Sequence, residues 1–336
     1  MPKISVILPI YNAQSFIADA VKSVLTQSEK DFELILIDDA SSDDTPRILA
    51  RMTDPRVNIV RHEENLGLVA SLNEGLHLSR GRFIARMDHD DIAMPDRFAQ
   101  QLAFLEVNHS VGVVGTGYQL INGEGKLGPR YRPPVTHEEI SWAMSFVCPL
   151  AHPTVVARRE LLIACGGYSD AAAYAEDYDL WERLSRKVKF ANLPDPLLLL
   201  RKHKENMTEV WLDRNIAVAT GVASRRIAFL LGEEVERDVV RCLYTQGYLH
   251  QERIEHSIEL IMRLMHVCKT KYPSVHRIIQ HDAAIRIALM GLRAKRPSLA
   301  LTCLFQASKL NPNLASELVK KLMRRIFNKG VVQLVG

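Results

Sequence analysis

The chain has 336 residues, of which 47% are hydrophobic and 24% charged, a composition typical of globular proteins with a substantial core. A net charge of +4 is too small to indicate a nucleic-acid-binding protein, so we expect no nucleic-acid partner. The five cysteines are scattered and form no C-x-x-C pair, so neither a disulfide framework nor a cysteine zinc site is indicated.

Strand and helix patterns alternate over the first 120 residues. Apolar runs predict buried strands, and helical spacing of apolar residues predicts helices between them. We expect strands at 4–8, 32–37, 57–60, 83–87 and 111–114, and helices around 16–25, 44–52, 66–78 and 95–107. Ser41 or Ser42 is available to cap the helix at 44–52. The alternation predicts an α/β fold with a mostly parallel central sheet covered on both faces.

Polar and acidic side chains follow three of these strands. Tyr11-Asn12 follows the first, Asp38-Asp39 the second and Asp88-His89-Asp90-Asp91 the fourth. In open α/β sheets the carboxyl ends of the strands form the ligand-binding edge. Two carboxylates spaced i, i+2 can reach one hard divalent cation. The pattern favours a metal with a phosphorylated ligand, although a solvated turn is an alternative for residues 88–91, because Asp is common in turns.

The alternation ends after residue 122, where glycines and prolines indicate loops. A helix is expected to begin at 175–181, and from about Trp211 onward the pattern is helical. Segments 283–292 and 298–310 are expected to form an antiparallel pair whose small residues are similar to one tetratricopeptide unit. A basic amphipathic segment at 314–329 could lie on an anionic membrane surface or pack on the protein.

The amino terminus runs straight into the first strand pattern, which leaves no room for a signal peptide. No apolar run approaches the ~18 residues that a transmembrane helix needs. We therefore expect a cytoplasmic protein.

Several motifs occur in a fixed order along residues 3–208. They are Ile4–Asn12, Leu36–Asp43, Asn65-Leu66-Gly67 with Asn73, Gly81–Asp91, His152-Pro153-Thr154, Gly166-Gly167-Tyr168, Ala175–Trp181 and Arg201-Lys202-His203. With these motifs the chain resembles a family 2 glycosyltransferase of the GT-A fold. The resemblance implies a GT-A domain at 1–208, followed by a helical region at 209–336 that contacts the acceptor or the membrane.

The resemblance implies transfer of a sugar from a nucleotide diphosphate donor, with a UDP-sugar favoured, to a glycan or lipid-linked acceptor. The family's range suggests bacterial surface polysaccharide synthesis at the inner face of the cell membrane. It implies Mn²⁺ or Mg²⁺ as cofactor and inversion at the anomeric carbon, although a retaining mechanism stays open.

The resemblance also assigns the donor side of the site. Asp88 and Asp90 would hold the metal, with His203 as a further ligand, while Asp91 would orient the turn. Asp39 would accept a hydrogen bond from the base, and Asp38 would fix the same loop. The remaining donor-side residues are Pro9, Tyr11, Asn12 and His89, with Pro9 and Tyr11 walling the base pocket. For Tyr11 a core aromatic role is the alternative. Ala40 stands where the family commonly has Gly, which limits positive φ there.

On the acceptor side, Asp177 matches the family's catalytic base, and Glu176 could contact the acceptor. Asp179 is a weaker rival, and an acidic helix start that suits the dipole is the alternative for the whole segment. The resemblance also places Arg201 near the diphosphate and His152 on the acceptor side.

Other functions fit less well. A nicotinamide oxidoreductase would carry G-x-G-x-x-G after its first strand, but residues 9–14 are Pro-Ile-Tyr-Asn-Ala-Gln. A sugar nucleotidyltransferase would need a Gly-rich basic loop there. The remaining alternative is a non-catalytic nucleotide-sugar-binding module of a polysaccharide-assembly complex.

Overall fold

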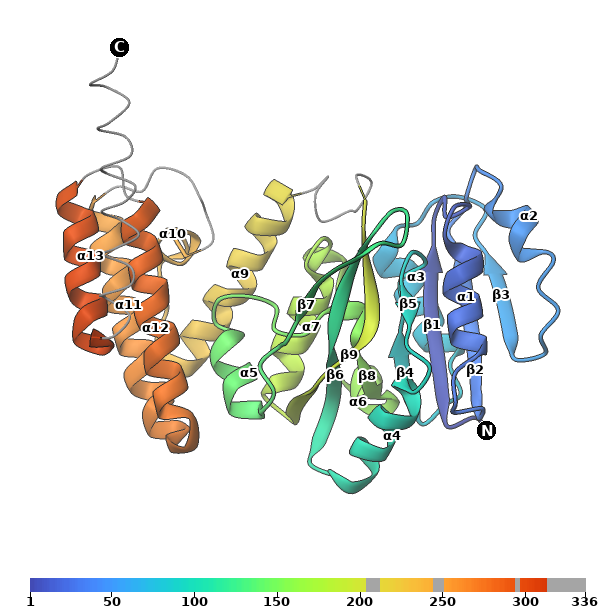
Figure 1. Ribbon diagram of the computed structural model, residues 1–336, viewed down its shortest axis with the longest axis horizontal. Coiled ribbons are helices and arrows are strands. Elements are labelled where there is room, and N and C mark those ends of the chain that lie inside the picture. Colours follow the sequence, from blue (N-terminus) through green and yellow to red (C-terminus); the bar gives the residue numbers. More distant parts are fainter. Residues whose placement is uncertain (204–211, 244–250, 294–296, 313–336) are drawn as a thin grey trace, which may run out of the picture. The chain divides into compact units, whose positions relative to one another are not determined.

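The computed structural model describes residues 1–203, 212–243, 251–293 and 297–312 (Figure 1). The chain divides into two compact units, Met1–Ala219 and Thr220–Gly336, and each is described by itself. The domain boundary expected at 208 lies outside the described residues.

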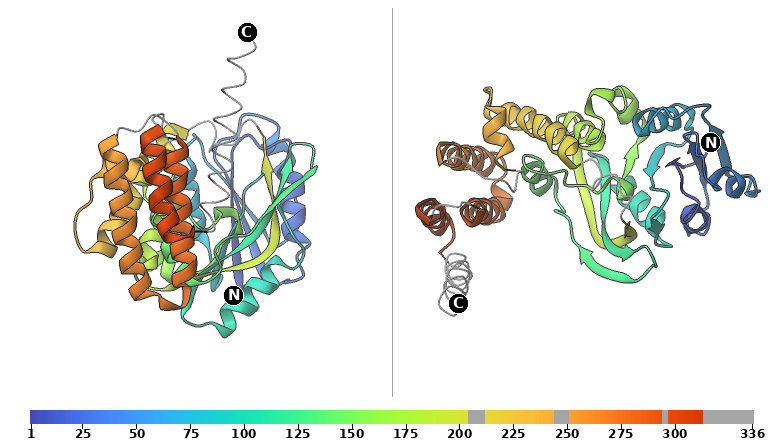
Figure 2. Two further views of the ribbon diagram at one scale, coloured as in Figure 1. Left: turned by 60° about the vertical axis from the view of Figure 1, so that its left-hand side comes forward. Right: turned by 90° about the horizontal axis from the view of Figure 1, so that it is seen from above.

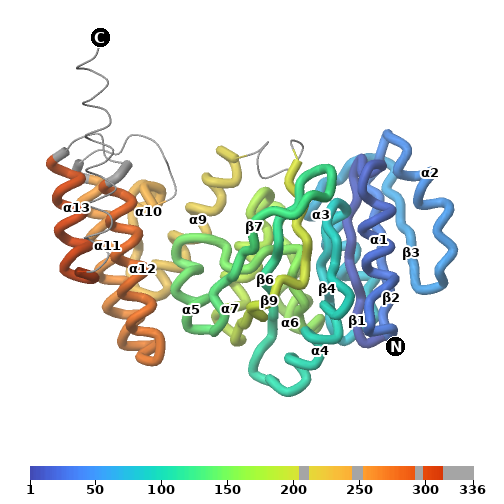
Figure 3. Tube along the Cα trace, viewed as in Figure 1, coloured from blue at the N-terminus to red at the C-terminus, as the bar shows by residue number. Residues whose placement is uncertain are grey.

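One sheet of nine strands forms the centre of the first unit (Figures 1 and 3). Its strand order is β3-β2-β1-β4-β8-β6-β9-β5, and β7 pairs with β6. The strands are β1 (Ile4–Ile10), β2 (Phe32–Asp38), β3 (Val57–Arg61), β4 (Phe83–Arg86), β5 (Ile92–Ala93), β6 (Val111–Asn122), β7 (Leu127–Tyr131), β8 (Val156–Arg158) and β9 (Lys189–Lys202).

Most strands of this sheet run in one direction. β1 is parallel to β2 and β4, and β2 is parallel to β3. β8 is antiparallel to both β4 and β6, so β6 and its parallel neighbour β9 run the same way as β1. The predicted mostly parallel α/β sheet is confirmed. The carboxyl ends of β1, β2 and β4 therefore meet at one edge.

Helices cover both faces of the sheet, as near-continuous apolar strands require. Val6 and Leu8 of β1 pack in one core with α1 (Ile17–Leu25) and α4 (Arg97–Val107). Ile7 faces the other way, against α3 (Leu68–Leu78), where a Cβ on Gly75 would lie 2.4 Å from Ile7 Cγ2. The ribbon views show helices on the two sides of the sheet (Figure 2). The other helices of this unit are α2 (Thr45–Leu49), α5 (His137–Ala143), α6 (Arg159–Ala164), α7 (Glu176–Ser185) and the short η1 (His152–Thr154) and η2 (Asp170–Ala172).

Two details differ from the sequence-based expectation. Neither Ser41 nor Ser42 caps the helix, which begins only at Thr45 with Asp44 at the N-cap. Ser41 Oγ instead accepts from the Asn12 amide, and Ser42 donates its amide to Asn12 Oδ1, so both serines join the loops after β1 and β2. β6 continues to Asn122 rather than ending at 114, because it pairs along its length with β9.

The described part of the second unit is helical, as predicted. Beyond α9 (Leu212–Leu231), which crosses the unit boundary, it contains α10 (Arg237–Arg241), α11 (Gln251–Lys271), η3 (Pro273–Val275), α12 (His276–Arg293) and α13 (Pro297–Leu310). The helices α11, α12 and α13 stand side by side (Figures 1 and 2). A Cβ on Gly291 would lie 2.6 Å from Cys303 Cβ, so α12 and α13 pack closely, as expected for this pair.

The basic amphipathic segment expected at 314–329 lies outside the described residues. Among the helices of the described ranges, none combines the length and apolar character that a membrane crossing requires.

The loop after β2 carries backbone strain at Ala40. Its φ is +57°, in the left-handed region, and its amide donates to the Asp38 carbonyl at 2.9 Å. An L-residue with a Cβ is disfavoured there by roughly 1–2 kcal/mol, whereas glycine is not. The sequence therefore places a strained residue immediately after Asp39.

We predict that Ala40→Gly raises the free energy of unfolding by roughly 0.5–1 kcal/mol, because relief of strain exceeds the extra entropy of the unfolded chain. Urea denaturation measures this change. Ala50→Gly is the matched control, because Ala50 is exposed with a φ of −61° and should lose stability on the same change. Equal effects of the two substitutions would contradict the argument.

Candidate active site

The carboxyl ends of β1, β2 and β4 bring three of the predicted motifs to one edge. In the sheet register Ile10 lies beside Asp38, and Ile7 lies beside Arg86. Tyr11, Asp39 and Asp88 therefore follow neighbouring strand ends. Tyr11 is 48% exposed, which excludes the alternative of a core aromatic.

Side-chain bonds fix the loops beside Tyr11. Asn12 has a φ of +50° and is tied to the β2 loop through Ser41 and Ser42. The carbonyl of Pro9, which is buried, lies 3.4 Å from His89 Nδ1. The residues expected at the donor base thus come together at one end of β1.

The acidic pair after β2 is held by separate sets of donors. Asp38 accepts from the Ser41 amide and pairs with Arg61 Nη1 at 3.0 Å, so its carboxylate stays within the loop. Asp39 accepts from the amides of Leu66 and Gly67, both at 2.8 Å, and from His62. The Asn65-Leu66-Gly67 motif therefore serves to hold Asp39.

The turn after β4 gathers three carboxylates. One oxygen from each of Asp88, Asp90 and Asp91 lies within 4.8 Å of the others. Asp91 is only 2% exposed. Its Oδ1 accepts from the Arg201 amide at 2.8 Å, while its buried Oδ2 has no hydrogen-bond partner. Burial, then the charges of Asp88 and Asp90, raise the pKa of Asp91 well above its usual range.

This carboxylate cluster fits a divalent cation. Hard cations prefer oxygen ligands, and an unpartnered buried carboxylate oxygen is unfavourable without a positive charge nearby. Asp91, expected only to orient the turn, contributes both the bond to Arg201 and an oxygen in the cluster. His203 Nε2 lies 2.9 Å from Asp90 Oδ2, and its ring packs on Phe16.

Arg201 stabilises the acidic turn from a buried position. Its guanidinium donates to the carbonyls of Asp90 (2.8 Å), Asn122 and Gly123, lies over the Phe16 ring, and the residue is 4% exposed. Arg201 thus donates to backbone carbonyls from a buried position, and its expected place near the diphosphate stays a prediction.

Sequence reasoning missed a buried cation at the centre of the site. Arg86 ends β4, is 5% exposed and forms an ion pair with Asp88. Its charge also acts on Asp91, Glu176 and Asp177, whose pKa values it lowers, although burial raises each of them more. An arginine inside an otherwise apolar strand is the available signal, although the apolar run by itself predicts only a buried strand.

The two carboxylates that open α7 lie in a buried environment. Asp177 accepts from the Tyr178 amide at 2.7 Å and from Cys148 Sγ at 3.5 Å. Burial raises the pKa of Asp177 above its usual value. Burial and the neighbouring Asp177 raise the pKa of Glu176 to about 7. Asp179 instead pairs with Arg183 at 2.8 Å, which leaves it a structural role.

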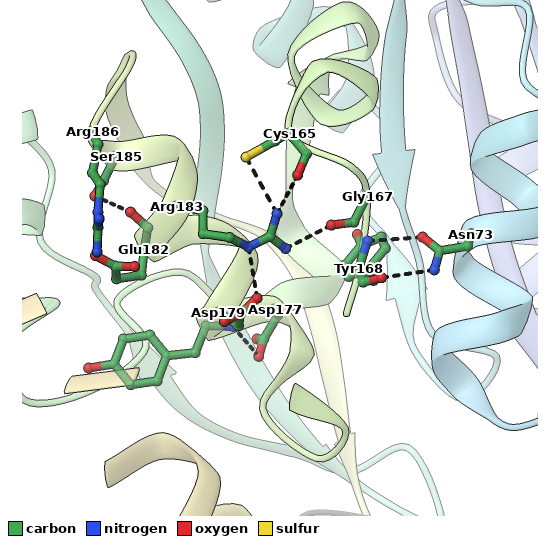
Figure 4. A network of polar contacts seen from close by, with 11 residues as sticks. Asn73, Cys165, Gly167, Tyr168, Asp177, Asp179, Glu182, Arg183, Ser185 and Arg186 are labelled. Atoms are coloured by element: carbon green, nitrogen blue, oxygen red, sulfur yellow. Dashed lines mark hydrogen bonds and ion pairs between the residues drawn. The ribbon is translucent and has the colours of Figure 1, made fainter. Parts of the chain in front are cut away.

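A network of polar contacts fixes α7 relative to α3 (Figure 4). Arg183 donates to the carbonyls of Cys165 and Gly167, and the Asn73 amide bonds both the amide and the carbonyl of Tyr168 at 2.9 Å. Gly167 has a φ of +66°, and a Cβ there would lie 2.5 Å from Asn73 Oδ1. The Gly166-Gly167-Tyr168 motif and Asn73 thus support the start of α7.

His152 lies among aromatic side chains. Its Nε2 is 2.9 Å from the Tyr168 hydroxyl, its ring meets the edge of Trp181, and the residue is 7% exposed. Burial, then the charge of Arg86, lower the pKa of His152 well below its usual value. The imidazole is therefore buried and bonded to Tyr168, and its expected place on the acceptor side stays a prediction.

Comparison with known proteins decides the family. The model of "Glycosyl transferase family 2" matches residues 5–165. Putative glycosyltransferase EpsE of Bacillus subtilis is 36% identical over 61% of this chain and 74% of its own length. The O-antigen biosynthesis glycosyltransferase WbnJ of Escherichia coli is 31% identical over 60% and 81% respectively. The chain belongs to glycosyltransferase family 2.

Solved structures show that this glycosyltransferase has the GT-A fold. Residues 1–349 of S. aureus TarS, crystallised in complex with UDP-GlcNAc, match with a TM-score of 0.57 at 17% identity, over 95% of this chain and 92% of that TarS chain. The mannosyltransferase PcManGT of Pyrobaculum calidifontis, in complex with GDP-Man and Mn²⁺, matches with a TM-score of 0.54 at 18% identity, over 98% and 88%. The sequence-based fold and family predictions are confirmed.

The raised pKa of Glu176 predicts a pH dependence of stability. The folded chain holds this proton up to about pH 7, whereas an exposed glutamate releases it near 4.5. As far as Glu176 decides it, the free energy of unfolding is therefore highest below pH 4.5 and falls as the pH rises toward 7. We expect Glu176→Gln to be more stable than the wild type by roughly 1–3 kcal/mol at about pH 8, with little difference at about pH 4.

Urea denaturation at the two pH values measures this difference. Glu160→Gln on the exposed face of α6 is the matched control and should change stability by less than about 0.5 kcal/mol at either pH. A Glu176→Gln curve that follows the wild type at both pH values would contradict the buried, protonated state.

Proposed function

We propose that this glycosyltransferase moves a sugar from a UDP-sugar to a glycan or lipid-linked acceptor of a surface polysaccharide, with inversion. One observation carries the proposal: the acidic cluster after β4 and the carboxylates that open α7 act on the same buried cation, Arg86. The O-antigen role in the name of WbnJ and the UDP-GlcNAc bound by TarS support the acceptor and donor classes.

The donor diphosphate would lie at the cluster of Asp88, Asp90 and Asp91. Mn²⁺ or Mg²⁺ bound there would stabilise the negative charge that develops on the leaving diphosphate. His203, whose Nε2 lies 2.9 Å from Asp90 Oδ2, would be a further ligand of that metal. Arg86 balances part of the negative charge from the buried side.

The nucleotide base would lie between Tyr11 and Asp39. Tyr11 presents an exposed ring on which a base can pack, and Pro9 supports the strand end beneath it. Asp39 accepts a hydrogen bond from the base, while Asn12 and Asp38 hold the two loops in place. His89 lies beside Pro9 on the same side.

The acceptor hydroxyl would meet Asp177. In an inverting displacement its proton passes to a base as oxygen bonds the anomeric carbon, and Asp177 accepts that proton. Burial moves the pKa of Asp177 upward, toward the operating pH, which is favourable for a general base. Glu176, with a pKa raised to about 7, can donate a hydrogen bond to an oxygen of the acceptor substrate.

The lipid-linked acceptors of this family suggest a place at the inner face of the cell membrane. The segment that suggested peripheral membrane contact, residues 314–329, lies outside the described residues, so this location rests on the family alone.

We expect Asp177→Asn to lower the rate of transfer by about 10²–10⁴-fold, because the amide cannot accept the proton, while nucleotide binding stays unchanged. Asp179→Asn is the matched control on the same helix, because Asp179 is engaged by Arg183. Release of nucleoside diphosphate from donor and acceptor measures the rate. Wild-type turnover in Asp177→Asn would remove Asp177 from the base role.

We expect UDP to bind more tightly with Mn²⁺ than without it, and Asp90→Ala to abolish that gain of about tenfold or more, because a ligand oxygen is lost. Calorimetric titration with UDP, GDP, CDP and ADP measures the affinities. Asp96→Ala, which changes an exposed carboxylate at the start of α4, should retain the gain. A wild type that binds none of the four nucleotides would overturn the donor assignment.

A further inference from the structure

His62 lies between two carboxylates beside the loop that follows β3. Its Nδ1 is 2.7 Å from Asp39 Oδ1 and its Nε2 is 2.5 Å from Glu74 Oε2. The imidazole side chain is 6% exposed, whereas the Glu74 side chain on α3 is 36% exposed. A line of contacts therefore runs from the surface through His62 to Asp39.

Both ring nitrogens of His62 face acceptors, so the ring donates to each carboxylate when it carries two protons. Burial alone would lower the pKa of His62. The bonds to Asp39 and Glu74 outweigh that effect and raise the pKa above its ordinary value of 6.5. The doubly protonated ring is favoured at pH values below the raised pKa.

The donors around Asp39 restrict what its carboxylate can do. His62 and the amides of Leu66 and Gly67 all donate to it, so both oxygens are held as acceptors in one orientation. The two amides belong to a backbone turn and are fixed by it. His62 is the one of these three donors that reaches Asp39 through a side chain, and its orientation is set by Glu74.

We propose that His62, oriented by Glu74, is a positioning residue that holds Asp39 as an acceptor and thereby sets which nucleotide base the donor pocket takes. The inference rests on the proposed function. Uracil presents an N3–H that a carboxylate accepts, whereas cytosine presents a bare N3 whose lone pair faces the carboxylate unfavourably. Guanine and adenine differ in the same way at N1. A fixed acceptor thus favours uracil or guanine and rejects cytosine and adenine.

The test is the ratio of affinities for UDP and CDP, measured by calorimetry with Mn²⁺ on the full chain. Wild-type binding with preference for UDP is the first requirement, and it tests the proposed function separately. Two substitutions then each keep one of the two hydrogen-bonding positions of the His62 ring. The amide nitrogen in His62→Asn takes about the position of Nδ1 and can donate to Asp39, whereas that in His62→Gln takes about the position of Nε2 and reaches only Glu74.

We expect His62→Gln to lower the UDP-to-CDP affinity ratio about tenfold, and His62→Asn, which keeps the donor to Asp39 but loses the contact with Glu74, to lower it by no more than about threefold. A purely structural role would change both variants alike, in thermal midpoint and in overall affinity, without changing the ratio. Retention of the full ratio in His62→Gln would overturn the inference, even if UDP binding itself is confirmed. A wild type that does not prefer UDP to CDP would overturn it as well.

Glu74→Gln provides a second test that does not depend on the stability of the His62 variants. It replaces a partly exposed side chain, so we expect a folded protein with an unchanged thermal midpoint within a few degrees. Loss of the charge that orients Nε2 should lower the affinity ratio about threefold. An unchanged ratio in this variant would overturn the role of Glu74 and with it the proposal that Glu74 acts on Asp39 through His62.

Discussion

A concentration of negative charge around one buried guanidinium is the feature on which the rest of this site depends. Asp88, Asp90 and Asp91 crowd one turn, while Glu176 and Asp177 begin the neighbouring helix, and Arg86 acts on groups of both sets. Buried carboxylates at such spacing cannot all stay ionised without positive charge. Two consequences follow: the pKa values of Asp91 and Glu176 are raised, and the cluster offers oxygens to a cation. A site with excess negative charge is suited to a metal and to a reaction that needs a base.

Rigidity comes from side chains that never face the ligand position. Arg201 bonds three carbonyls behind the acidic turn, Arg183 and Asn73 fix the loop before α7, and Asp38 closes its own loop. Each of these polar groups has partners that satisfy it, which is what burial demands. At this edge of the sheet, therefore, one set of side chains supplies carboxylates, and a second set of arginine, asparagine and histidine side chains holds the loops that carry them.

Which motif residues face the ligand position and which hold the fold becomes clear only when their surroundings are known. His152 and Arg201 match the family pattern as well as Asp177 does, yet both are buried and engaged within the protein. Spacing along the chain does not distinguish these two roles, because one motif contains both residues that contact a ligand and residues that hold the fold. His62 shows the converse, since it stands three residues before the Asn65-Leu66-Gly67 motif and contacts Asp39 directly.

The sequence by itself determined the alternation of strands and helices, the acidic strand ends, the family and the helical region that follows about residue 211. Apolar periodicity is a local consequence of side-chain pattern, and the strand–helix alternation that it predicts implies parallel strands, which bring Tyr11, Asp39 and Asp88 to one edge. Only the tertiary structure decided the place of Arg86, the contacts that run from Glu74 through His62 to Asp39, and the burial of Arg201. These depend on contacts between residues far apart in the chain, such as Asp91 with Arg201, and on desolvation, which no run of neighbouring residues records.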